Sequence, residues 1–163
     1  MAYDSARQRT VLFGGDLGLA KVLADTWEYG IPNLTLTANT PTISIANGGT
    51  QNLTLNAGTD LKNKLYWIFG SMTGTMPGVV LTGIHIPLRV DPYTDLVIGF
   101  ANGKEFKDFK RTLSATGTAT ASLNVPAKLP IPTGFKLYHA YVVYHGTTGQ
   151  IFTSSNPVSV EFK

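Results

Sequence analysis

The three histidines of this chain are the side chains best suited to proton transfer near neutral pH. They are His85, His139 and His145, and Ser71 is a candidate nucleophile that His85 could approach through the fold. His139 and His145 are six residues apart in one expected strand, so they share a face but lie about 20 Å apart, too far to hold one metal ion. Gly70-Ser71-Met72-Thr73-Gly74 lacks the spacing of a nucleophile elbow. An exposed or hydrogen-bonded histidine is therefore the simpler interpretation of each.

Two carboxylates offer a candidate metal site. Asp91 and Asp95 begin and end the run Asp91-Pro92-Tyr93-Thr94-Asp95. Two carboxylates around a proline turn could bind one hard cation such as calcium, with backbone carbonyls completing the ligand shell. An ordinary turn between strands is the alternative. We expect no other cofactor, because the chain has no cysteine and because Gly14-Gly15 and Gly48-Gly49 open no helix that could hold a phosphate.

Aromatic residues supply a third candidate site. Trp67, Tyr138, Tyr141 and Tyr144 occur in segments that are apolar or aromatic on both faces of an extended chain. Because these side chains cannot all lie inside one core, the exposed ones could form a platform that stacks on sugar rings or contacts a protein partner. Packing in the core is the alternative for each of them.

The composition indicates strands rather than helices. The chain has 163 residues, of which 43% are hydrophobic and 14% charged, with 17 glycines and 9 prolines, so short strands between many turns are expected around one core. The net charge of +3 is small and spread along the sequence, so a nucleic-acid partner is not expected. We find no apolar stretch that could span a membrane and no export signal, so no membrane partner is expected either.

Alternation of apolar and polar residues predicts the individual strands. It is clear at 34–36, 42–46 and 51–56, and Asn47-Gly48-Gly49 between the last two predicts a tight hairpin. Further strands are expected at 65–69, 84–86, 96–100, 116–125, 137–144 and 158–162. The prolines of 126–134 predict a stiff connector. The eight or nine strands expected after Gly30 favour an all-β fold, a two-sheet antiparallel β-sandwich of the immunoglobulin-like or jelly-roll-like kind.

The first thirty residues carry a different pattern. Val11-Leu12-Phe13-Gly14-Gly15 is followed by Asp25-Thr26-Trp27-Glu28-Tyr29-Gly30, and this order resembles part of a kelch repeat, the blade unit of a β-propeller. A propeller needs about four to eight blades, so residues 1–30 are expected to be a partial, kelch-like arm of strands. Because Phe13, Trp27 and Tyr29 are unfavourable in water, we expect the arm to pair with the sandwich or with a second copy, which favours a homo-oligomer.

Residues 31–163 are similar to uncharacterised β-sandwich domains that close large secreted bacterial proteins. The resemblance depends on the runs 66–71, 83–88, 115–119 and 153–158. It implies a secreted or cell-surface parent protein and a non-catalytic structural or ligand-binding module with a carbohydrate or protein partner. Two alternatives stay open, a small hydrolase of esters or lactones that is assisted by calcium, and a fragment without a role of its own.

Overall fold

The computed structural model describes residues 2–4, 9–16, 22–30 and 34–163. It divides into two compact units, Met1–Asn33 and Leu34–Lys163. A boundary after Gly30 is expected from the sequence, and this boundary stays a prediction. Each unit is described by itself below.

The first unit is a small antiparallel sheet. It contains β1 (Ala2–Asp4), β2 (Arg9–Asp16) and β3 (Val22–Gly30), in the order β1-β2-β3. Leu12 and Phe13 are 45% and 69% exposed, and neighbouring residues of a strand point to opposite faces. The unit therefore exposes apolar side chains on both faces of β2. The side chains of Trp27 and Tyr29, which entered the expectation of a swapped arm, lie outside the described part of the chain.

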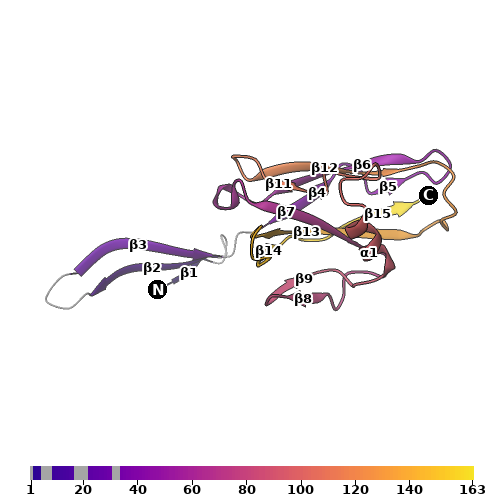
Figure 1. The fold of residues 1–163 in the computed structure, drawn as a ribbon. Helices are drawn as coiled ribbons and strands as arrows, with labels where there is room; N and C mark the ends of the chain where they lie inside the picture. The colour runs from indigo at the N-terminus through magenta and orange to yellow at the C-terminus, as the bar shows by residue number, and fades with distance from the viewer. Residues whose placement is uncertain (1, 5–8, 17–21, 31–33) are drawn as a thin grey trace. The chain divides into compact units, whose positions relative to one another are not determined.

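The second unit is a sandwich of two sheets (Figure 1). The four-stranded sheet has the order β10 (Phe106–Lys107), β12 (Thr118–Val125), β6 (Gly49–Asn56) and β4 (Thr35–Ala38). The six-stranded sheet has the order β11 (Lys110–Thr112), β7 (Leu65–Ser71), β13 (Lys136–Tyr144), β15 (Val158–Phe162) and β5 (Thr42–Ile43), and β14 (Ile151–Ser154) also pairs with β13. All pairs are antiparallel except β15 with β5. The prediction of an all-β sandwich is confirmed.

The core lies between the two sheets because alternate residues of each strand point inward. Leu53 and Leu55 of β6 and Ile68 of β7 are completely buried there. Tyr66 and Tyr141 of the six-stranded sheet meet edge to face in the same core, with their ring centroids 6.5 Å apart.

The predicted hairpin of 42–46 with 51–56 is wrong. β5 pairs with β15 in the six-stranded sheet, whereas β6 pairs with β4 and β12 in the four-stranded sheet. The turn at Asn47-Gly48-Gly49 carries the chain from one sheet to the other. Ile43 and Leu53 are both buried in the shared core, so the alternation correctly predicted the buried face but could not identify the neighbouring strand.

The predicted strand at 96–100 is also wrong, because this segment belongs to helix α1 (Pro92–Gly99). Asp91 is the N-cap, its side chain accepts from the backbone of Tyr93 and Thr94, and Pro92 takes the first helical position. A short apolar run does not distinguish strand from helix, and here the start signal Asp-Pro decides for the helix.

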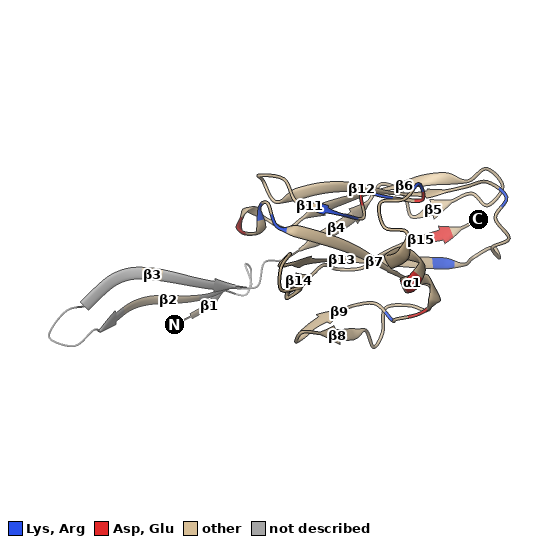
Figure 2. Cartoon of the chain, in the orientation of Figure 1, with Lys and Arg blue, Asp and Glu red and all other residues tan. Residues whose placement is uncertain are grey.

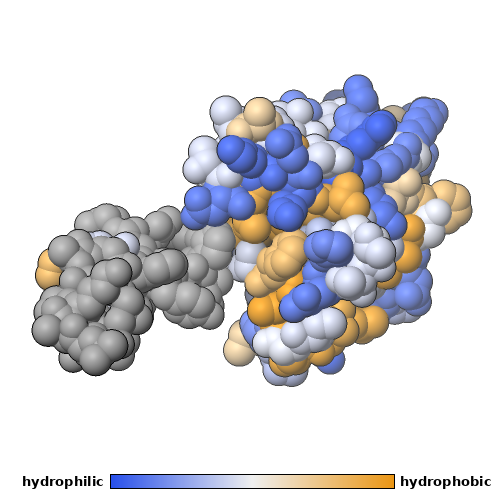
Figure 3. Space-filling model, turned by 60° about the vertical axis from the view of Figure 1, so that its left-hand side comes forward, coloured by the Kyte–Doolittle hydropathy of each residue, from blue (hydrophilic) through white to orange (hydrophobic). Residues whose placement is uncertain are grey.

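A hairpin of β8 (Val79–Leu81) and β9 (Ile84–Ile86) covers the outer face of the six-stranded sheet, with Ile86 and Leu88 packed against Ala140 and Val142. The strand at 84–86 therefore pairs with β8 in a separate two-stranded sheet. Figure 3 shows hydrophobic side chains exposed among hydrophilic ones on the second unit. A short 3-10 helix, η1 (Thr59–Leu61), precedes β7. The connector 126–134 has no regular structure, as predicted.

Charged residues of both signs are dispersed over the second unit (Figure 2). Within the described ranges, the structure holds no helix that is long and apolar enough to cross a membrane.

Candidate ligand cavity between the sheets

A cavity of about 480 Å³ opens between the sheets at one end of the sandwich. At this end β7, β12 and β15 finish and β13 begins. The sheets contribute Leu123 of β12, Leu137 of β13 and Phe162 of β15 to the walls. These three side chains are almost fully buried and belong to the core. The cavity is therefore an unfilled extension of the core that reaches the surface.

Two segments outside the sheets complete the walls. Helix α1 contributes Tyr93, Leu96 and Phe100, the last of these at its C-cap. The connector 126–134 contributes Leu129 and Ile131. Proline lacks the backbone donor needed for a sheet, so this proline-rich segment crosses from β12 to β13 as a loop and presents apolar side chains to the opening.

Asp91 attaches α1 to the end of β7. Its Oδ2 accepts hydrogen bonds from Ser71 Oγ at 2.8 Å, from the backbone N–H of Met72 at 2.9 Å, and from the N–H and Oγ1 of Thr73 at 3.0 and 2.8 Å. Its Oδ1 accepts from the first turn of α1. Burial alone would raise the pKa of Asp91, but the hydrogen bonds from Ser71, Thr73 and Met72 outweigh it and lower the pKa from 3.8 to about 2.

These donors occupy the lone pairs with which Asp91 would bind a cation. Asp95 is exposed in the first turn of α1. Among the described residues, no three histidine, aspartate or glutamate side chains lie close enough together to hold a metal ion. The calcium site stays a prediction from sequence, and Asp91 has a clear structural role.

His139 lies in the core and not in a solvent cleft. Its Nε2 is 2.9 Å from the hydroxyl of Tyr93, and its ring meets that of Phe109 edge to face. Complete burial lowers the pKa of His139 from 6.5 to about 4. Its Nδ1 is buried without a hydrogen-bond partner among the described residues. The imidazole is therefore neutral at pH 7.

The structure does not bring Ser71 and His139 together. His139 is paired with Gly70 across the sheet, and both residues belong to the inner face of the sheet. Ser71 is paired with Tyr138, and both belong to the outer face. Ser71 is completely buried and donates to Asp91. The serine and the buried histidine therefore cannot act as nucleophile and base on one substrate in this fold.

The other two histidines are exposed and lie elsewhere in the second unit. His85 is in β9, and its Nε2 is 2.8 Å from the carbonyl oxygen of Pro77. His145 follows the end of β13 at Tyr144, so the expectation that it shares a strand with His139 is wrong. Its backbone N–H donates to Gln150 in the turn that leads to β14. The three histidines thus occupy separate elements or faces.

The four aromatic candidates do not form one platform. Tyr141 is fully buried on the inner face of the six-stranded sheet. Trp67, Tyr138 and Tyr144 are half-buried on its outer face, around the residues that the β8–β9 hairpin covers. The ammonium group of Lys110 lies 3.7 Å from the centroid of the Trp67 ring, where a sugar would stack.

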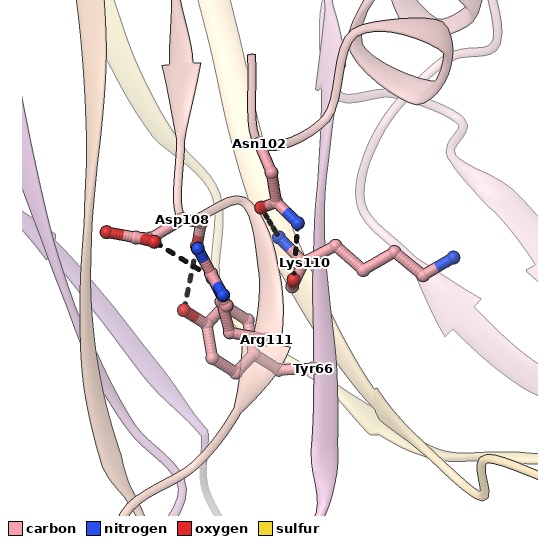
Figure 4. A network of polar contacts seen from close by, with 5 residues as sticks. All are labelled: Tyr66, Asn102, Asp108, Lys110 and Arg111. Atoms are coloured by element: carbon pink, nitrogen blue, oxygen red, sulfur yellow. Dashed lines mark hydrogen bonds and ion pairs between the residues drawn. The ribbon is translucent and has the colours of Figure 1, made fainter. Parts of the chain in front are cut away.

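Side chains also close the edge of the six-stranded sheet near Trp67. Figure 4 shows the Asn102 side chain against the backbone of Lys110, where it accepts from the N–H at 3.0 Å and donates to the carbonyl at 2.8 Å. The hydroxyl of Tyr66 donates to the carbonyl of Asp108 at 2.7 Å, and Arg111 pairs with the Asp108 carboxylate. This network fixes the crossing between β10 and β11, and so supports the wall that β10 adds to the cavity.

Sequence reasoning missed the cavity. Most of its lining residues come from a segment predicted as a strand, a segment predicted as a connector, and the ends of three correctly predicted strands. Two signals could have indicated part of it. Asp91-Pro92 marks a helix start, and Leu129 and Ile131 are apolar residues in a loop whose prolines keep them out of a sheet.

The sequence matches no family model, and no curated protein matches it. Three solved structures are similar in fold. A glycosyl hydrolase family 2 member from Bacteroides cellulosilyticus has a TM-score of 0.44 and 12% identity, and the match covers 86% of this chain and 16% of that one. The chain thus spans about a sixth of the length of that protein.

The second similar structure is the ASH/PapD-like domain 7 of human CEP192, with a TM-score of 0.41, 8% identity, and coverage of 91% of this chain and 96% of that one. The third is a Niemann-Pick type C2 protein from the Japanese carpenter ant, with a TM-score of 0.32, 11% identity, and coverage of 80% and 89%. At sequence identities this low, the similarity concerns the fold alone. The kelch resemblance of residues 1–30 stays a prediction.

Proposed function

We propose that residues 34–163 are a non-catalytic binding module that holds an apolar small molecule, or the apolar part of a larger one, between its two sheets. The observation that carries this proposal is the cavity of about 480 Å³ with almost entirely apolar walls. Its size falls within the roughly 300–1,000 Å³ typical of small-molecule sites, which are mostly apolar with a few polar groups.

The physical argument is that these walls interact poorly with water. A ligand that removes about 200 Å² of apolar surface from water gains about 5 kcal/mol, before the cost of association is subtracted. With about 500 Å² buried in total from the ligand and the walls, the gain is about 12 kcal/mol, and after about 4 kcal/mol is lost on association the remaining ~8 kcal/mol corresponds to micromolar affinity. The cavity is already formed in this structure, so little reorganisation is needed when a ligand enters.

Binding is favoured over catalysis by the residues at the cavity. Its described lining includes neither Ser71 nor any histidine. Among the lining residues, Glu105 is the one with a carboxylate, and none is a lysine, an arginine or an aspartate. A carboxylate without a partnered base or nucleophile supports recognition better than hydrolysis. The resemblance to closing domains of secreted bacterial proteins adds that the module would serve a larger protein.

The test uses an uncharged apolar dye, Nile red, whose fluorescence rises when it leaves water. We expect the full chain to bind it with micromolar affinity. The variant Leu96→Trp places a large ring at the mouth of the cavity and is expected to weaken binding at least about tenfold. Leu96 is 46% exposed, so the larger side chain does not need to enter the core.

The matched control is Ile98→Trp on the same helix. Ile98 is 40% exposed and lies outside the lining of this cavity, on the side of α1 that faces the β8–β9 hairpin. It is expected to bind Nile red like the original chain. Equal loss in both variants, or no binding by the original chain, would contradict the proposal.

A further inference from the structure

We propose that Glu105 selects the class of ligand, an apolar chain that ends in a hydrogen-bond donor, either an ammonium or a hydroxyl group. This inference rests on the proposed function and deepens it. The ligands it disfavours are those that end in a carboxylate, such as fatty acids.

The backbone around Glu105 is held at the end of β12. The carbonyl oxygen of Glu105 accepts from the N–H of Asn124 at 2.7 Å, and the carbonyl of Lys104 accepts from Asn124 Nδ2 at 2.9 Å. The next residue, Phe106, is buried in the core. The segment that carries Glu105 is therefore fixed against the wall of the cavity, and Glu105, which is half-buried, is one of the residues that line that wall.

The other polar side chains of the lining already have partners. Asn124 uses its Oδ1 to accept from Thr50 Oγ1 at 2.9 Å, while its Nδ2 donates to Lys104. The hydroxyl of Tyr93 is 2.9 Å from His139 Nε2. A ligand in the cavity therefore meets two polar groups that are already satisfied.

Glu105 differs from both. In the second unit, Arg111 forms an ion pair with Asp108, and Lys136 forms one with Glu161. Within residues 34–163, the carboxylate of Glu105 has neither an ion pair nor a side-chain hydrogen bond. Among the polar side chains of this wall, it is thus the acceptor left without a partner within residues 34–163, and a carboxylate accepts hydrogen bonds but donates none.

Electrostatics indicates which ligands the carboxylate of Glu105 favours. At an effective dielectric constant near 20, two unit charges about 4 Å apart interact by about 4 kcal/mol, which favours an ammonium and disfavours a carboxylate. Glu105 is half-buried and the cavity is open to solvent, so screening reduces this value. We expect about a tenfold difference in affinity. A hydroxyl group carries no charge but still donates, so an alcohol should fall between the two.

The experiment compares decylamine, decanol and decanoate by calorimetric titration of the full chain at pH 7, below the micelle concentrations of the two charged ligands and the solubility limit of decanol. These ligands share one apolar chain and differ at the end that would face Glu105. We expect decylamine to bind best, and decanoate to bind at least about tenfold more weakly than decylamine. We expect added salt to weaken the binding of decylamine and to leave the binding of decanol unchanged. This difference would distinguish binding through an ammonium group from binding through a hydroxyl group.

Two variants assign the selection to one residue. Glu105→Gln removes the charge at nearly constant volume and is expected to bring decanoate and decylamine to within about threefold of each other. Asp95→Asn removes an exposed carboxylate of α1 that lies outside the lining, and should leave the order unchanged.

The outcomes separate the two proposals. If the three ligands bind equally well, or if Glu105→Gln keeps the original order, the inference about Glu105 is overturned while the binding cavity stands. If none of the three ligands binds, both proposals fail.

Discussion

Six hydrogen bonds converge on the carboxylate of Asp91, four at Oδ2 and two at Oδ1. The donors come from the end of β7 and from the first turn of α1. One side chain thus fixes the position of the helix that presents Tyr93, Leu96 and Phe100 to the cavity. Asp91, one of the two carboxylates that suggested a calcium site, thus has a helix-capping role.

His139 makes the stability of the second unit depend on pH. Burial lowers its pKa from 6.5 to about 4, so between these values the unfolded chain binds a proton that the folded chain excludes. This contribution to stability is complete above pH 6.5 and is lost as the pH falls toward 4, by about 3 kcal/mol in total.

The variant His139→Phe keeps a ring in the core but removes the titrating group. We expect the free energy of unfolding, measured by urea denaturation from pH 7 to pH 4, to fall more steeply for the original chain than for this variant. Because both chains contain the same carboxylates, the comparison cancels the contribution that these groups make to the pH dependence of the free energy of unfolding. Parallel curves would show that His139 is not the cause.

At the scale of elements, the contact between α1 and β7 depends on a glycine. A methyl group at Gly70 would overlap the ring of Tyr93 and come within 3.0 Å of Val97 Cγ2. We therefore expect Gly70→Ala to displace α1, to lower stability by about 1–3 kcal/mol, and to weaken Nile red binding. Gly99→Ala at the end of the same helix meets no atom within 4 Å and is the matched control. Urea unfolding and dye titration of both variants provide the measurement, and equal behaviour would refute the contact.

Strands whose inward and outward residues differ clearly could be predicted from sequence. β7, β12, β13 and β15 lie where their patterns placed them, to within a few residues. The pairing of β5 could not be predicted, since alternation reports which face is buried and not which strand lies beside it. The helical state of 96–100 was missed because its apolar run is too short to show a period.

The candidate site was less predictable than the fold. Aromatic and histidine side chains were chosen for their chemistry, yet Tyr141 and His139 are core residues. The cavity depends on how α1 and the connector 126–134 cover the open end of the sandwich. That arrangement follows from contacts between distant segments, such as Asp91 with Ser71 and Tyr93 with His139. Spacing along the sequence does not encode these contacts directly.

At the scale of the whole molecule, the first unit exposes Leu12 and Phe13 on its central strand. An apolar surface on so small a sheet favours association. We expect sedimentation velocity of the full chain to show a concentration-dependent oligomer, and Phe13→Ser to weaken it. A compact monomer in which residues 1–30 resist protease would argue against an exchanged arm.

The central claim is that an apolar ligand enters between the sheets, and methyl NMR of the full chain tests it most directly. On titration with decanol, the methyl resonances of Leu123, Ile131 and Leu137 should shift together and saturably, because these residues line the cavity. Those of Leu36 and Leu55, buried in the same core but outside the lining, should stay in place. Shifts confined to the outer face around Ile86 and Val142, or no shifts at all, would contradict the account.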